Sequence, residues 1–113
     1  MSKISFGTKI IPTINQSAFV ATIGAMVRDK SELLHEFSRV LLFPEYFGNN
    51  WDALNDCLCD LTWIKERGIV IVFESISHLD NKTQEILIDI LNEVVQFWNI
   101  NNELHDIEII INE

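Results

Sequence analysis

Three strand-like runs separated by helix-like segments constrain the fold of this chain more than any other feature. Ile69–Phe73 (IVIVF) is a continuous apolar and β-branched run, the pattern of a strand covered on both faces. Ala18–Ile23 (AFVATI) and Ile107–Ile111 (IEIII) are the other two runs. Strands separated by helical crossovers pair in parallel. We therefore expect a small single α/β domain in which a three-stranded parallel sheet packs with about four helices.

Capping and helix-breaking residues suggest where the first helix begins and ends. Ser31 is a good N-cap for a helix with apolar residues at helical spacing, and Pro44 stops that helix. A long amphipathic helix is expected from about Lys82 to Trp98.

The N-terminal residues are the least readable part of the chain. The segment Lys9–Ile11, set between a glycine and a proline, permits either a short edge strand or an extended arm. We therefore divide the chain into an N-terminal extension, residues 1–17, and a domain formed by residues 18–113.

The stretch Phe43–Leu61 (FPEYFGNNWDALNDCLCDL) predicts an aromatic, amide-rich loop that leads into an acidic helix capped by Asn50. Apolar residues cover one side of this helix and three carboxylates lie on the other. Like charges one turn apart cost roughly a few tenths of a kcal/mol per pair, so fold stability does not explain these carboxylates. Binding to an electropositive partner would explain them. The polar side consists of Asp52, Asn55, Asp56, Cys59 and Asp60.

The charge balance limits the class of partner. Seventeen acidic against eight basic residues give a formal net charge of −9 among 113 residues. Such a field repels nucleic acid and anionic membranes and attracts basic proteins or cations, although acidity can also serve solubility alone. The two cysteines, Cys57 and Cys59, point to opposite sides of the helix and cannot pair there, which indicates a reducing compartment. Without a signal-like N-terminus or a long apolar run, we expect a cytoplasmic protein with no membrane partner.

The acidic stretch resembles the signature of the barstar family, small intracellular inhibitors of secreted ribonucleases. Members share a Pro-Glu-Tyr-aromatic-Gly loop, a nearby asparagine and the sequence Asp-Ala-Leu-x-Asp-Cys-Leu. The match is long and contiguous, and the order of the elements extends it more weakly from about Val20 to the C-terminus. The matching positions are Pro44, Glu45, Tyr46, Phe47, Gly48, Asn50, Asp52, Ala53, Leu54, Asp56, Cys57 and Leu58.

The resemblance implies how the protein acts. In this family the acidic helix and the loop before it fill the ribonuclease active site, with carboxylates in place of RNA phosphates. By position, Asp56 is then the principal phosphate mimic, and Asp52 pairs with another basic group. Tyr46 lies against the catalytic side chains and Asn50 bonds the enzyme, while Glu93 on the last helix matches a further contact acid. The partner is a basic extracellular-type ribonuclease or a related toxin, and the free inhibitor is a monomer.

Several residues depart from the family pattern, and partner identity commonly depends on such positions. Asn55 stands where a tryptophan is common, Asp60 replaces a small residue, and Cys59 replaces a hydroxyl residue. Trp51 enlarges the aromatic surface beside Asn50. Inhibition of barnase itself therefore does not follow. The expected partner-binding residues are Tyr46, Asn50, Trp51, Asp52, Asn55, Asp56, Asp60 and Glu93.

Two other functions compete with ribonuclease inhibition. One is immunity against a toxin with different chemistry, such as a DNase. The other is a small hydrolase or metal-binding protein that uses the acidic face. The three histidines, His35, His78 and His105, are scattered and each is expected at the surface or at a helix end. No nucleophile with an orienting base and no set of zinc ligands is evident. We therefore expect neither catalysis, nor a cofactor, nor a metal.

Overall fold

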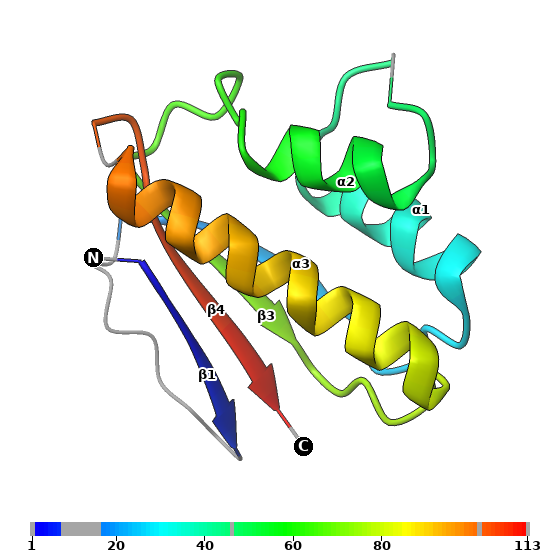
Figure 1. Ribbon diagram of the computed structural model, residues 1–113. Coiled ribbons are helices and arrows are strands. Elements are labelled where there is room, and N and C mark those ends of the chain that lie inside the picture. The colour runs from blue at the N-terminus through cyan, green and yellow to red at the C-terminus, as the bar shows by residue number, and fades with distance from the viewer. Residues whose placement is uncertain (1, 8–16, 46, 102, 113) are drawn as a thin grey trace.

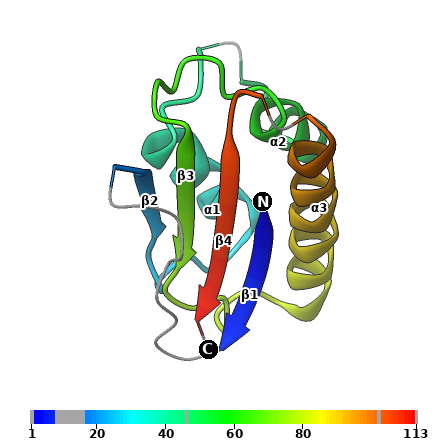
Figure 2. The ribbon, with the colours of Figure 1, turned by 90° about the vertical axis from the view of Figure 1, so that its left-hand side faces the viewer.

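The fold is a parallel sheet with helices packed against one face (Figures 1 and 2). The computed structural model describes residues 2–7, 17–45, 47–101 and 103–112. The strand order is β1-β4-β3-β2, and every neighbouring pair is parallel. In Figure 2 the strands face the viewer, α1 and α2 lie behind them, and α3 runs alongside β1 and β4. The elements are β1 (Lys3–Gly7), β2 (Phe19–Ile23), α1 (Lys30–Val40), α2 (Trp51–Leu58), β3 (Gly68–Phe73), α3 (Asn81–Ile100) and β4 (Asp106–Asn112).

The three predicted strands are present as β2, β3 and β4, and β1 adds a fourth. The expectation of a three-stranded sheet is therefore wrong by one edge strand. The described ranges hold three helices where about four were expected. The segment Lys9–Ile11, considered above as a strand or an arm, lies outside the described residues.

Polar contacts hold β1 at the edge of the sheet. The amide group of Asn99 in α3 bonds the backbone of Ser2 twice, accepting from its N–H at 2.8 Å and donating to its carbonyl at 3.0 Å. The Ser2 hydroxyl accepts the N–H of Ile107 at 2.8 Å. Lys3 Nζ lies 3.7 Å from the buried carboxylate of Glu108. Because these partners are distant in the sequence, the local pattern of residues 3–7 does not reveal the strand.

The core lies between the sheet and the helices. Strand register aligns Ile69 with Ile107, Ile71 with Ile109, and Phe73 with Ile111. All six side chains are buried and belong to the main hydrophobic cluster. The rings of Phe37 in α1 and Phe73 in β3 meet edge to face, with centroids 5.7 Å apart. The continuous β-branched runs thus form the central strands, as their pattern predicts.

The helix boundaries follow from their caps. The side chain of Asp29, and not that of Ser31, caps α1 by accepting the N–H of Glu32 at 2.9 Å. Asp80 caps α3 in the same way, through the N–H of Thr83 at 2.7 Å. Within the described ranges, no helix combines the length and the apolar character needed to cross a membrane.

Candidate protein-binding surface

The loop before α2 fixes the start of the acidic helix. Asn50 Oδ1 accepts the N–H of Ala53 at 2.7 Å, which confirms the predicted cap, and its Nδ2 donates to the Gly48 carbonyl at 3.3 Å. A Cβ at Gly48 would lie only 3.2 Å from Asn50 Nδ2, so the loop leaves little room for a side chain there. Asn50 is exposed, but part of its hydrogen-bonding capacity is used by the helix cap.

The acidic helix ends earlier than its sequence pattern predicts because tertiary contacts hold its C-terminal end. Trp98 Nε1 donates to the Leu58 carbonyl at 2.8 Å, and His105 Nε2 donates to the Leu61 carbonyl at 2.8 Å. Leu61 has φ 50°, a left-handed conformation that is rare for leucine. The helix therefore ends at Leu58, with Cys59 as its C-cap. His105, predicted at the surface or at a helix end, is fully buried against the Trp98 ring.

The three aspartates of this stretch do not share one helix face. Asp52 and Asp56 are exposed on α2. Asp60 lies in the turn after the helix, where its N–H bonds the Cys57 carbonyl at 3.1 Å, and it is half-buried. The prediction that Asp60 follows Asp56 by one helical turn is therefore wrong. Asp60 nonetheless follows α2 directly, two residues after the last residue of the helix.

Cys59 lies between the carboxylates of two helices. Its thiol has a pKa raised to about 11, mainly by burial and further by the negative charges of Asp56 in α2 and Glu93 in α3. Cys57 is buried, as predicted, and burial also raises its pKa. Cys59 is half-buried, and it is therefore less accessible than its place on the polar side of the helix predicted. The negative charges of Asp56 and Glu93 thus both act on Cys59, although they belong to different helices.

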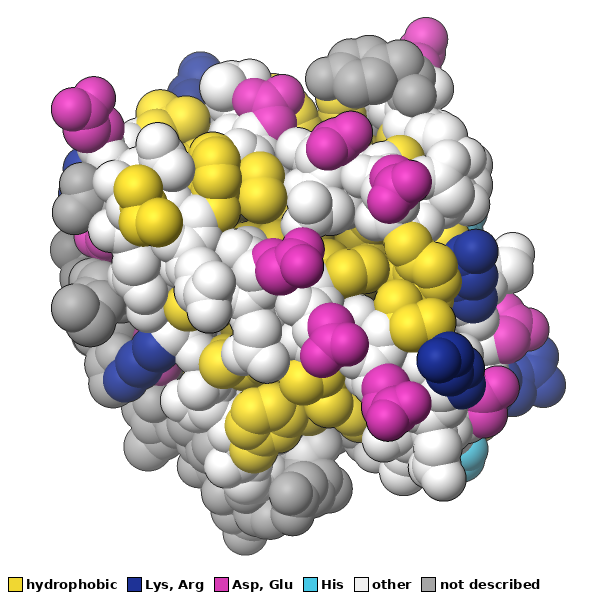
Figure 3. Space-filling view, viewed as in Figure 1, with side chains coloured by type: hydrophobic (Ala, Val, Ile, Leu, Met, Phe, Trp, Pro, Cys, Tyr) yellow, Lys and Arg dark blue, Asp and Glu magenta, His cyan; other side chains and the backbone are white. Residues whose placement is uncertain are grey.

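A second row of carboxylates runs along α3. Glu85, Asp89 and Glu93 are exposed and follow one another at four-residue spacing, so they share one side of the helix. Figure 3 shows Asp and Glu side chains gathered over both α2 and α3, with hydrophobic side chains between them. Glu85 and Asp89 were absent from the predicted site, although their spacing was visible in the sequence. The term acidic surface is used below for Asp52, Asp56, Asp60, Glu85, Asp89 and Glu93.

Asn55 carries an unsatisfied polar atom within this region. Its side chain is half-buried, and its Oδ1 is buried without a hydrogen-bond donor among the described residues. A buried acceptor that lacks a partner costs about 1–3 kcal/mol. Such a cost would apply to Asn55 in the free protein unless another group or water supplies a donor.

The aromatic residues of the loop divide between core and surface. Phe47 is buried and packs edge to face on Phe43, with ring centroids 4.9 Å apart. Trp51 is half-buried at the start of α2, and the ammonium of Lys30 lies 5.4 Å from its ring centroid. Tyr46, a predicted contact residue, lies outside the described residues.

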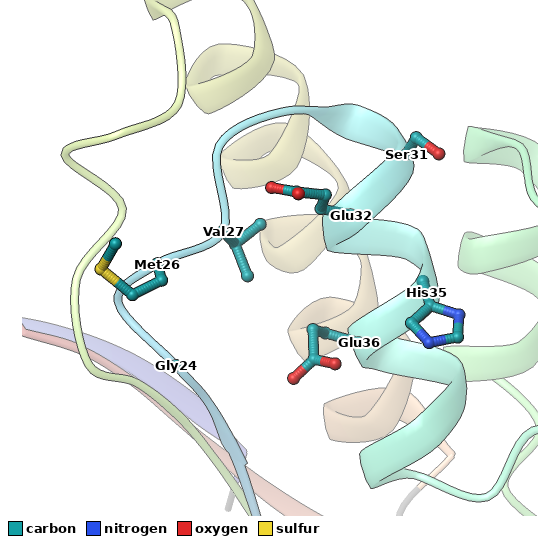
Figure 4. A pocket seen from close by; sticks show the side chains of 7 residues that line it. All are labelled: Gly24, Met26, Val27, Ser31, Glu32, His35 and Glu36. Carbon is teal, nitrogen blue, oxygen red and sulfur yellow. The ribbon is translucent and has the colours of Figure 1, made fainter.

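One hollow of the described surface lies apart from the acidic surface. This hollow, of about 490 Å³, lies between the end of β2 and α1 and includes Gly24, Met26 and His35 (Figure 4). Its acids, Glu32 and Glu36, are already bound by arginines of the same segment. Among the described residues, no group of three or more potential ligands could hold a metal ion. Five of the six carboxylates of the acidic surface are exposed and therefore available for contact with another molecule.

Comparison with known proteins gives one family. Residues 18–111 match the family model described as Barstar (barnase inhibitor). A comparison with curated proteins gives no match. The matched region includes α2, α3 and every residue of the acidic surface, whereas β1 precedes it.

Proposed function

The chain belongs to the barstar family, and we propose that it inhibits a cognate ribonuclease by filling the active site with α2, the preceding loop and the acidic surface. A ribonuclease must hold a cationic cleft, because its substrate is a polyanion. Carboxylates on a rigid helix can occupy such a cleft in place of phosphates. Family membership supports a partner of the barnase type, and the geometry of this chain supports the surface that meets it.

One observation carries the proposal: within the described part, the six carboxylates of the acidic surface form no ion pair with the protein's own basic groups. Some acids elsewhere differ, since Glu32 and Glu36 are each paired with an arginine. Six unneutralised carboxylates on two packed helices and the turn after α2 repel one another and do not stabilise the fold. A cationic partner would neutralise them together.

The proposed contacts keep the roles that the family suggests. Asp56 is the principal phosphate mimic and Asp52 pairs with a second basic group. Asp60 and Glu93 extend the charge on either side of Cys59. The half-buried side chain of Asn55 is a further proposed contact. The remaining contacts are Tyr46, Asn50 and Trp51.

We further propose that the protein is not an enzyme and acts as a monomer in the cytoplasm, where it protects the cell that makes the ribonuclease. Both cysteines are free, which agrees with a reducing compartment. Residues 18–113 would form the inhibitory domain, and residues 1–17 would contribute to its stability.

A direct test is the inhibition of a panel of purified basic ribonucleases of the barnase type, barnase included, assayed on a fluorogenic RNA substrate. A DNase toxin, assayed on DNA, serves as the comparison. We expect stoichiometric inhibition of at least one ribonuclease and none of the DNase. If the protein inhibits only the DNase, it is an immunity protein of another kind. Inhibition of no enzyme at micromolar concentration would contradict the proposal.

A further inference from the structure

A cation lies at the edge of the acidic surface and covers an aromatic ring. Lys30 Nζ is 5.4 Å from the centroid of the Trp51 ring, within the roughly 6 Å at which a cation and an aromatic face attract each other. Lys30 is exposed, and Trp51 is followed directly by Asp52. Figure 3 shows basic side chains at the margin of this face and none among the carboxylates at its centre.

The fold does not require a lysine at this position. Lys30 is the first residue of α1, where a positive charge opposes the helix dipole. Arg28 and Arg39 near the two ends of α1 are each paired with a glutamate. In the part of the chain that the structure describes, Lys30 has no such pair, and its recorded contact is the Trp51 ring.

Trp51 differs from the other tryptophans in its hydrogen bonding. Trp63 donates its indole N–H to the Leu41 carbonyl at 2.9 Å, and Trp98 donates to the Leu58 carbonyl. The indole N–H of Trp51 has no acceptor among the described residues. In the described part of the chain, the recorded polar contact of Trp51 is therefore the Lys30 ammonium, in place of an indole hydrogen bond.

A hollow beside the pair has room for a side chain of a partner. It measures about 430 Å³ and is open to solvent. Besides the buried Leu34, its lining is exposed and polar. The lining residues are Lys30, Ser31, Leu34, His35 and Asn49.

We propose that Lys30, held over the Trp51 ring, determines specificity, because the cognate enzyme places a carboxylate in this hollow, against the Lys30 ammonium. This inference rests on the proposed function and adds a requirement to it. A partner that is basic across its whole contact surface would be repelled at Lys30, whereas an enzyme with an acid beside its cationic cleft would be selected.

The test uses the ribonuclease of the panel that the wild-type protein inhibits most strongly, and compares Lys30→Met, Lys30→Arg and Lys30→Glu. Loss of the ion pair with the partner's carboxylate should weaken binding by about two- to fivefold in Lys30→Met. Lys30→Glu should weaken it further, and Lys30→Arg should bind like the wild type. Thermal stability should change little in the Met and Glu variants, because loss of the contact with the Trp51 ring offsets removal of a cation from the first turn. A marked loss of stability in Lys30→Met would indicate a structural role for Lys30 instead.

Lys82→Met is the matched control, because it removes another exposed cation from the first turn of a helix and changes the net charge equally. With a basic partner, this control should bind equally well or slightly more tightly. If Lys30→Met or Lys30→Glu also binds as well as or better than the wild type, the inference is wrong. The proposed function survives that result as long as Asp56→Ala still abolishes inhibition. If the wild type inhibits no ribonuclease, both fail.

Discussion

Trp98 of α3 donates its indole hydrogen bond to the carbonyl oxygen of Leu58, the last residue of α2, at a distance of 2.8 Å. The bond is buried and connects the ends of the two helices that carry the acidic surface. Asp56 lies in the last turn of α2, and Glu93 lies on α3 before Trp98. This bond, together with the shared hydrophobic core, therefore helps to set the position of the two rows of carboxylates relative to each other.

Replacing Trp98 by Phe should separate the two rows while keeping most of the aromatic packing. We expect a loss of about 1–3 kcal/mol in the free energy of unfolding, because the Leu58 carbonyl is left without its donor. Affinity for the ribonuclease should fall as well, since Glu93 loses its fixed position beside Asp56. Trp63→Phe is the control, because it removes an indole bond at Leu41, away from the acidic surface. Equal affinity losses in both variants would contradict the role given to Trp98.

Cys59 reports the charge around it. Its pKa of about 11 keeps the thiol protonated at neutral pH, so alkylation of the folded protein should be slow at pH 8 and accelerate toward pH 11. Replacing Asp56 by Asn or Glu93 by Gln removes a nearby negative charge and should lower the pKa and speed alkylation at pH 9. The decrease should be modest, because burial is the largest cause of the raised pKa. Glu85→Gln should change the rate less than either, and an equal change would mean that Glu93 does not face Cys59.

Asn50→Ala should cost about 0.5–2 kcal/mol of stability through loss of the α2 cap. Asp80→Ala, which removes the cap of α3, should also destabilise the protein, but with a different dependence on pH. The pKa of Asp80 is lowered by the hydrogen bond from the Thr83 N–H. Its contribution is therefore present above the unfolded pKa and is lost as the pH falls through the lowered value. Denaturation curves at neutral and strongly acidic pH should show the Asp80 effect vanishing and the Asn50 effect persisting. Inhibition should suffer only in Asn50→Ala.

Asn99→Ala tests the contribution of the N-terminal extension. It removes both hydrogen bonds to the Ser2 backbone and should cost about 1–3 kcal/mol. Hydrogen exchange should quicken in β1, while affinity for the ribonuclease stays unchanged, because Asn99 lies at the C-terminal end of α3, beyond Glu93, and β1 carries no residue of the acidic surface. Asn101→Ala, which removes a single exposed bond to the Phe97 carbonyl, is the control. A loss of affinity in Asn99→Ala would place the extension within the inhibitory surface.

The sequence predicts the central fold because its signals there are local. The β-branched runs identify β3 and β4, since strands buried on both faces have few polar residues. By contrast, Lys3–Gly7 contains two polar residues and a glycine, and it becomes a strand through contacts with Asn99 and Glu108 that no short window contains. The same reason applies to the burial of His105, whose partner Leu61 is also distant in the sequence.

The candidate site is predictable to a similar extent. The cap at Asn50 and the exposure of Asp52 and Asp56 follow from helical spacing and hold in the structure. The position at which α2 ends does not follow from helical spacing. Leu61 takes a left-handed conformation, and its carbonyl is bonded by His105, which is distant in the sequence. The position of Asp60 changes accordingly.

The most direct measurement of the central claim is affinity and stability together for Asp56→Ala. We expect binding to the ribonuclease to weaken by about 2–5 kcal/mol, a range that comes from measured interfaces, the barnase–barstar complex among them, and not from this structure. Stability should stay equal or rise by about 0.3–1 kcal/mol, because Asp56 lies in the last turn of α2, where a negative charge opposes the helix dipole. Glu74 is an exposed acid outside the acidic surface, so Glu74→Ala controls for net charge. It should change neither the affinity nor the stability strongly. An Asp56→Ala protein that binds like the wild type, or that loses stability in step with affinity, would contradict the claim that this carboxylate is displayed for a partner.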